Sequence, residues 1–168
     1  MSYVHELLSY TGPLDYFFAQ HLQHVVQQAF KDTGILSERR FDNEFDYICY
    51  VLSAYYHAPI NISVVAELFN RHQSVGLALE EKIVVAEITL LTCGFFRRQS
   101  LSRGRRAYPL KFYMTMAQQL YLEIRNFFPS KSYERVGWHF KQWTRALDLL
   151  AMRFEEQQLP SYVIRIEK

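Results

Sequence analysis

The sequence lacks the features that mark several large classes of protein. It has only two cysteines, Cys49 and Cys93, which are too few for a zinc ligand set and are predicted to be buried thiols. No apolar run approaches the roughly 20 residues that a membrane helix needs, and the N-terminal residues have neither the basic region nor the apolar stretch of a secretory signal. We therefore expect a cytoplasmic protein without a membrane partner.

Motifs that carry catalysis are also missing. The sequence has no glycine-rich phosphate loop, no nucleophile elbow, no His-Glu metal motif on a helix and no pair of acids at a suggestive spacing. We therefore expect no enzymatic activity, no catalytic residues, no cofactor and no metal site.

What the sequence does have is apolar and aromatic content. Of its 168 residues 49% are hydrophobic, and 12 tyrosines and 13 phenylalanines are among them. This is far too much apolar surface for a disordered chain. The length suits one well-buried core but not two domains of ordinary size, so residues 1–168 are interpreted as a single unit.

Positive charge is concentrated in one short segment. The net charge is only +2, but no acidic residue lies between Glu87 and Glu123. Six of the 19 basic residues fall in this stretch, which leaves 13 basic and 17 acidic residues in the rest of the chain. A local excess of this kind favours nucleic acid as a partner.

Apolar residues recur at three- and four-residue spacing along most of the chain, which predicts helices. Proline and glycine mark several of their ends, as at Pro13, Gly34 and Pro59. The pattern changes at residues 95–112, where two short segments flank a basic tip and predict a β-hairpin. Helices are expected at about residues 13–31, 42–57, 63–70, 77–92, 115–128 and 133–157, and strands at 95–99 and 106–112.

The helices at 63–70 and 77–92 meet across a turn that contains Gly76, as the two helices of a helix–turn–helix do. The basic hairpin that follows them is placed where a wing would be. The sequence therefore predicts a mainly α fold with a small β-hairpin wing, which is a winged helix–turn–helix flanked by N- and C-terminal helices.

The last predicted helix carries an apolar seam with spacings of four, three, four, three and four residues, close to the heptad pattern of a coiled coil. Two interpretations stay open, because the seam can pack against the first helix of the same chain or against a partner subunit. So regular a seam on a terminal helix favours a homodimer. Its residues are Val136, Phe140, Trp143, Leu147, Leu150 and Phe154.

With this order of elements, the chain resembles the multiple-antibiotic-resistance regulator (MarR) family of winged-helix repressors. The sharpest likeness covers residues 88–98 and 103–112, which are similar to the end of the family's recognition helix, a glycine and the two wing strands with their basic tip. The resemblance implies dimerisation helices at about 13–34 and 115–157, and a DNA-binding lobe at about 42–112. It also implies double-stranded DNA as the partner.

The chain departs from the family at Gly104, where the family usually has Asp, and in the acidic residues of the second helix. Glu80, Glu81 and Glu87 are predicted to be exposed there, and carboxylates close to phosphates are repelled. We expect a homodimeric DNA-binding transcription regulator. The alternative is a winged-helix protein-interaction module that has lost operator recognition.

The basic residues of the predicted wing are candidates for contact with DNA, because arginine enters narrow minor grooves and pairs with phosphates. The alternative is a solvated basic hairpin. The candidate DNA-binding residues are Arg97, Arg98, Arg103, Arg105, Arg106, Lys82 and Lys111.

A candidate effector pocket combines His21 and His24, three residues apart on the first predicted helix, with Tyr47, Tyr50 and Tyr55 of the next helix. In the resembling family a pocket near the dimerisation helices often accepts small aromatic or phenolic effectors, so a small aromatic ligand is expected. The alternative is that the histidines are buried or interfacial and make ordinary hydrogen bonds.

Overall fold

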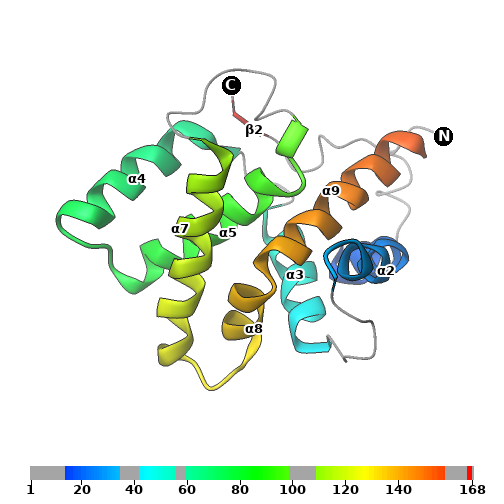
Figure 1. Cartoon of the computed structure of the whole chain (residues 1–168), viewed down its shortest axis with the longest axis horizontal. Coiled ribbons are helices and arrows are strands. Elements are labelled where there is room, and N and C mark those ends of the chain that lie inside the picture. Colours follow the sequence, from blue (N-terminus) through cyan, green and yellow to red (C-terminus); the bar gives the residue numbers. More distant parts are fainter. Residues whose placement is uncertain (1–13, 35–41, 56–59, 99–108, 158–165, 168) are drawn as a thin grey trace.

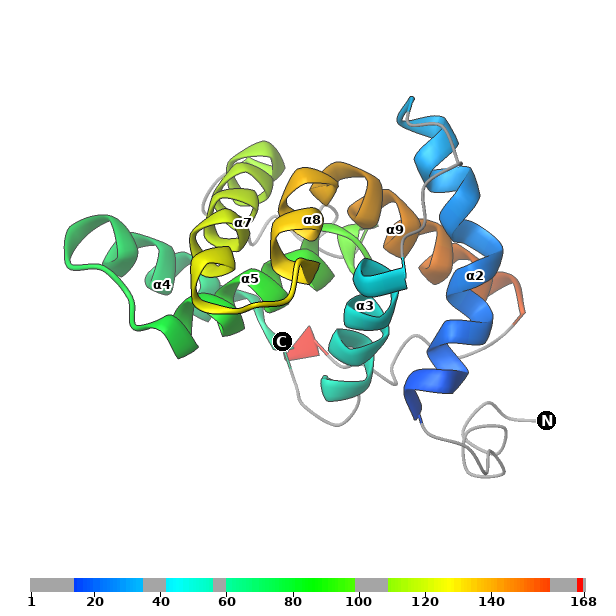
Figure 2. The same cartoon turned by 90° about the horizontal axis from the view of Figure 1, so that it is seen from below.

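The computed structural model describes residues 14–34, 42–55, 60–98, 109–157 and 166–167, and these are mainly helical (Figure 1). Two views at right angles place α4 at one end of the molecule and α2 at the other (Figures 1 and 2). The elements are α2 (Leu14–Asp32), α3 (Asp42–Ala54), β1 (Ile60–Asn61), α4 (Ile62–Ser74), α5 (Leu79–Cys93), α7 (Leu110–Ile124), the 3-10 turn η1 (Arg125–Phe127), α8 (Ser132–Trp138), α9 (Phe140–Glu156) and β2 (Ile166–Glu167).

The strands β1 and β2 are two residues each and pair in parallel, with Ile60 opposite Ile166 and Asn61 opposite Glu167. Together they form a single ladder between the start of α4 and a segment near the C-terminus. A pair this short adds little stability on its own, so helix packing dominates the described part of the fold.

The predicted β-hairpin wing is wrong. Residues 94–96 form a turn and 97–98 are helical, and α7 begins at Leu110, inside the predicted second strand. The backbone N–H groups of Gly94 and Phe96 donate to the carbonyls of Leu90 and Leu91, at 2.9 Å each. These donors therefore turn back onto the end of α5, and they do not meet a partner strand. Residues 99–108, which include the predicted wing tip, lie outside the described part of the chain.

Two side chains explain why this segment does not form a strand. Phe95 and Phe96 are neighbours in sequence and both are buried, with the Phe95 ring packed edge-on against Phe154 at 5.7 Å. A half-exposed edge strand would bury only one of two successive side chains. Pro109 lies immediately before the first residue of α7, where a missing backbone donor is harmless.

The core extends across the described helices, and one large part of it lies where α9 packs along α2 (Figures 1 and 2). Both helices contribute buried rings there, and Phe154 of α9 stacks on Phe18 of α2 at 6.3 Å. Near the other end of the same interface, the edge of Phe30 meets the ring of Trp143 at 5.3 Å. The apolar spacing that predicted the last helix therefore includes residues that pack on the first described helix.

The helix predicted at residues 133–157 is interrupted at His139, which separates α8 from α9. The buried carboxylate of Glu44 on α3 accounts for this position. Its Oε2 atom lies 2.8 Å from Nδ1 of His139 and accepts a 2.7 Å hydrogen bond from Nε1 of Trp143. The residue before α9 and the first turn of α9 thus meet α3 at one buried carboxylate oxygen, and sequence periodicity does not reveal this contact.

In the described ranges, no helix is both long enough and apolar enough to span a lipid bilayer.

Candidate functional site

The six residues predicted to form a dimer seam are all buried within the single chain. Val136, Phe140, Trp143, Leu147, Leu150 and Phe154 are each at most 1% exposed. Trp143 and Phe154 contact rings of α2, as the alternative interpretation of packing against the first helix expects, whereas Phe140 packs against Tyr121 of α7. The six side chains are thus buried without a second subunit.

Of the basic residues predicted to bind DNA, two pair with acids in the described part of the chain. The Nε and Nη1 atoms of Arg98 lie 3.8 and 3.6 Å from carboxylate oxygens of Asp148 and Glu155 on α9. Lys82 pairs with Glu123 of α7 at 3.2 Å. The fold thus brings acids to Arg98, which has none nearby in sequence. Arg97 is half-buried and Lys111 is exposed, whereas Arg103, Arg105 and Arg106 lie outside the described residues.

The three glutamates of α5 have different surroundings. Glu80 is exposed, and Glu81 pairs with Arg71 of α4. Glu87 is only 6% exposed, so the prediction that it faces solvent is wrong. It follows Ile83 by four residues and precedes Leu90 by three, so it continues the apolar stripe of the helix. That spacing is the signal by which the sequence could have identified it as buried.

The candidate effector residues separate into two places. His21 packs between the rings of Phe17 and Phe154, at 4.9 and 5.3 Å, and accepts a 3.4 Å hydrogen bond from Arg153. Burial, followed by the charge of Arg153, lowers the pKa of His21 to about 4, so the ring is neutral at pH 7. His21 therefore fits the alternative interpretation, in which the histidine is packed and makes an ordinary hydrogen bond. His24 is exposed on the same helix.

Three tyrosines and Glu87 form what we call the tyrosine–glutamate cluster, which comprises Tyr47, Tyr55, Glu87 and Tyr121. The Tyr47 hydroxyl donates to Oε2 of Glu87 at 2.9 Å, and the Tyr55 hydroxyl donates to Oε1 at 3.3 Å. A third contact joins the hydroxyls of Tyr47 and Tyr121 at 3.1 Å. The cluster links α3, α5 and α7 through one buried carboxylate.

Electrostatics keep the phenols of this cluster neutral. Burial raises the pKa of Tyr47 and of Tyr121 well above 10, and it also raises the pKa of Tyr55. The pKa of Glu87 is raised by burial too, although the hydrogen bonds from Tyr47 and Tyr55 act in the opposite direction. Tyrosine hydroxyls in this state donate hydrogen bonds and do not act as bases near neutral pH.

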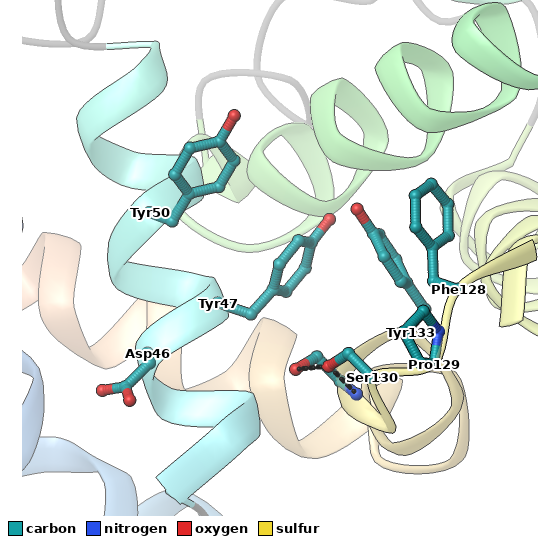
Figure 3. Close-up of a pocket in the computed structure, with 8 residues that line it drawn as sticks. Asp46, Tyr47, Tyr50, Phe128, Pro129, Ser130 and Tyr133 are labelled. Atoms are coloured by element: carbon teal, nitrogen blue, oxygen red, sulfur yellow. Dashed lines mark hydrogen bonds between the residues drawn. The ribbon is translucent and has the colours of Figure 1, made fainter.

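An open hollow of about 460 Å³, here called the tyrosine hollow, lies beside this cluster (Figure 3). Tyr47 belongs to both. Its ring meets Tyr133 edge-on at 5.1 Å, and Phe128 packs on Tyr133 at 4.8 Å. The hydroxyl ends of Tyr47 and Tyr133 turn toward each other in Figure 3. The lining residues are Asp46, Tyr47, Tyr50, Phe128, Pro129, Ser130, Ser132 and Tyr133.

The two walls of the hollow come from different elements. Asp46, Tyr47 and Tyr50 lie on one stretch of α3, and the ring of Tyr50 is 60% exposed. The opposite wall follows η1, where Pro129 prevents the turn from continuing as a helix. The Ser130 hydroxyl accepts a 3.2 Å hydrogen bond from the backbone N–H of Ser132, which fixes the chain at the start of α8.

The sequence identified only part of this site. Tyr47 and Tyr50 were predicted and line the hollow, and Tyr55 was predicted and belongs to the cluster behind it. The residues that were missed are Glu87, Tyr121, Phe128 and Tyr133. No group of three or more His, Cys, Asp and Glu side chains comes together as a metal site would need, within the residues that the structure describes.

Comparisons with protein-family models, with curated proteins and with solved structures give no match to this chain. The resemblance to the MarR family therefore rests on the residues quoted for it alone.

Proposed function

We propose that the protein is a non-catalytic binding protein that accepts a small aromatic molecule in the tyrosine hollow. The observation that carries the proposal is a concave site whose two walls present four aromatic rings, with hydroxyl groups between them. Small-molecule sites are typically hollows of roughly 300–1,000 Å³ with mainly aromatic and apolar walls and few polar groups. The volume of about 460 Å³ lies in this range.

The hydroxyl groups favour binding over catalysis. Glu87, the buried carboxylate beside the hollow, already accepts hydrogen bonds from Tyr47 and Tyr55. Its neighbours have raised pKa values and remain neutral, so they offer no base for proton abstraction. The neutral tyrosines of this site are therefore suited to holding a ligand by stacking and hydrogen bonds.

Ligand-observed saturation-transfer NMR with 2-phenylethanol tests the proposal. We expect saturable, weak binding, because one ring can stack in the hollow while the hydroxyl meets Tyr133 or a serine. Tyr50→Leu removes the most exposed ring and should weaken binding by roughly threefold to tenfold, since an aromatic pair contributes about 0.5–1.5 kcal/mol beyond its buried area.

The matched control is Trp138→Leu, which removes an exposed ring that does not line the hollow. It should leave the affinity unchanged. Equal affinities in Tyr50→Leu and the unmodified protein would contradict the placement of the ligand, and absence of binding to the folded protein would contradict the function itself.

A second candidate function is binding of double-stranded DNA by the basic stretch between Glu87 and Glu123, and the observation in its favour is that this stretch has no acidic residue. Its test is the double substitution Arg105→Ala and Arg106→Ala. If both contact phosphates, the slope of log affinity against log salt should become shallower by roughly 0.9 per contact. An unchanged slope would favour the alternative of a protein-interaction module.

A further inference from the structure

Charge is distributed unevenly around the tyrosine hollow. Among the described residues that line it, Asp46 carries the only charge, and no lysine, arginine or histidine is present. Asp46 is exposed and its carboxylate turns away from the rings in Figure 3, so it lies at the rim. The Asp46 carboxylate therefore acts on a bound ligand through its charge, over a distance limited by salt screening, and not through a direct hydrogen bond.

Two basic residues near this segment of the chain, Lys131 and Arg125, are paired with the same acid. Nζ of Lys131 lies 3.6 Å from Glu134, and Nη1 of Arg125 lies 3.7 Å from the other oxygen of the same carboxylate. Glu134 therefore offsets one of the two positive charges that these side chains bring near the wall formed by residues 128–133.

The inner side of the hollow also favours positive charge. The buried Glu87 carboxylate lies behind Tyr47, and its charge contributes to the raised pKa of Tyr133, after burial. Negative potential from Glu87 thus reaches two of the tyrosines that line the hollow. The faces of aromatic rings carry partial negative charge as well and attract cations within about 6 Å.

From this complementarity we infer that the ligand of the tyrosine hollow is an organic cation, namely a small aromatic amine that is protonated at neutral pH. The inference rests on the proposed function, because it names the class of ligand for the same site. The ring of the amine stacks on the aromatic walls, and the ammonium group lies between the exposed face of Tyr50 and the rim at Asp46. An anion of the same shape is repelled.

Three probes of nearly equal shape separate charge from shape. They are 2-phenylethylamine, which is a cation at pH 7, neutral 2-phenylethanol and the anion phenylacetate. By NMR titration in low salt we expect the amine to bind about tenfold more tightly than the alcohol, and phenylacetate to bind more weakly than both. Raising the salt concentration should narrow the difference between amine and alcohol.

Two variants locate the effect. Asp46→Asn removes the charge at the rim and should reduce the advantage of the amine by roughly threefold, without changing the affinity for the alcohol. Glu156→Gln is the matched control, because Glu156 is an exposed acid at the end of α9 that does not line the hollow. It should leave both affinities unchanged.

The outcomes separate this inference from the proposed function. If the alcohol binds as tightly as the amine, or if Asp46→Asn and Glu156→Gln behave alike, the ligand is not selected by charge at this rim and the inference is overturned, while the binding function stands. If none of the three probes binds to the folded protein, both are overturned.

Discussion

Glu87 shows how one buried side chain can organise a site. Its carboxylate lies where an apolar residue would continue the stripe of α5, and it accepts hydrogen bonds from the hydroxyls of Tyr47 on α3 and of Tyr55 just after α3. A buried carboxylate without such donors would be costly. The hydrogen bonds therefore explain why a glutamate is tolerated there, and its residual burial explains why its pKa remains raised.

Glu87 should make stability depend on pH. Because its pKa is higher in the folded protein than the usual 4.5, its contribution to folding is most favourable below about pH 4.5 and is lost as pH rises through the folded pKa. The free energy of unfolding, measured by urea denaturation between pH 4 and pH 8, should therefore fall less with rising pH in Glu87→Gln than in the unmodified protein.

The matched control for this experiment is Glu80→Gln, which changes an exposed acid of the same helix and should keep the pH dependence of the unmodified protein. The same pH dependence in both variants would show that Glu87 does not titrate in this range.

Glu44 is the second residue whose role depends on buried donors. Replacing it with alanine leaves Nε1 of Trp143 and Nδ1 of His139 without their shared acceptor. Glu44→Ala should therefore lower the free energy of unfolding by about 3 kcal/mol, because buried polar groups lose their partner. Asp46→Ala, an exposed acid on the same helix, should cost less than about 0.5 kcal/mol in the same denaturation experiment. Similar costs for the two would contradict the buried contact.

At the scale of elements, local periodicity predicted the helices well and the connections poorly. Residues 13–31 and 77–92 were predicted as helices, and α2 and α5 are observed close to those bounds. The segment at 95–112 was misjudged because its short apolar runs fit a strand locally, whereas contacts of Phe95 with α9 decide its conformation. The break at His139 likewise depends on Glu44, which is 95 residues away in sequence.

Gly94 follows α5 directly, and its backbone φ of −104° is open to any residue. Glycine is required at this position because neighbouring atoms pack closely against it. A Cβ atom there would lie 2.7 Å from Cβ of Leu147 and 3.0 Å from the carbonyl oxygen of Leu90. Gly94→Ala should therefore cost about 2 kcal/mol of stability, because two helices must move apart.

Gly137→Ala is the comparison for that experiment. A Cβ there meets the end of the Leu122 side chain at 2.9 Å, which can rotate, and alanine favours the helix. Thermal denaturation should show a clearly smaller loss for Gly137→Ala than for Gly94→Ala, and the reverse order would contradict the account of the α5–α9 contact.

At the scale of the whole molecule, the apolar seam of the last helix completes the core of one chain. Sequence spacing identified each of its six residues, but spacing alone does not distinguish a partner helix in the same chain from one in another chain. The same holds for the candidate site. The tyrosines of α3 were found because they lie together on one helix, whereas Phe128 and Tyr133 reach them only through the path of the chain around Pro129.

Phe154 distinguishes the two roles of the seam. Its ring is buried among Phe17, Phe18 and Phe95, so Phe154→Ala should cost about 3–5 kcal/mol. If the seam serves the core of one chain, the loss in melting temperature should be the same at about 5 µM and at about 100 µM protein. A loss that shrinks as concentration rises would show that the residue supports an interface between subunits.

Backbone amide chemical-shift mapping with 2-phenylethylamine is the sharpest test of the proposal that the tyrosine hollow binds a small aromatic molecule. On saturation we expect the shifted amides to fall in two groups, on α3 around Tyr47 and Tyr50 and in the segment from Phe128 to Tyr133. Shifts confined to another surface would contradict this placement of the ligand. The absence of any shift as the ligand is titrated would contradict binding itself.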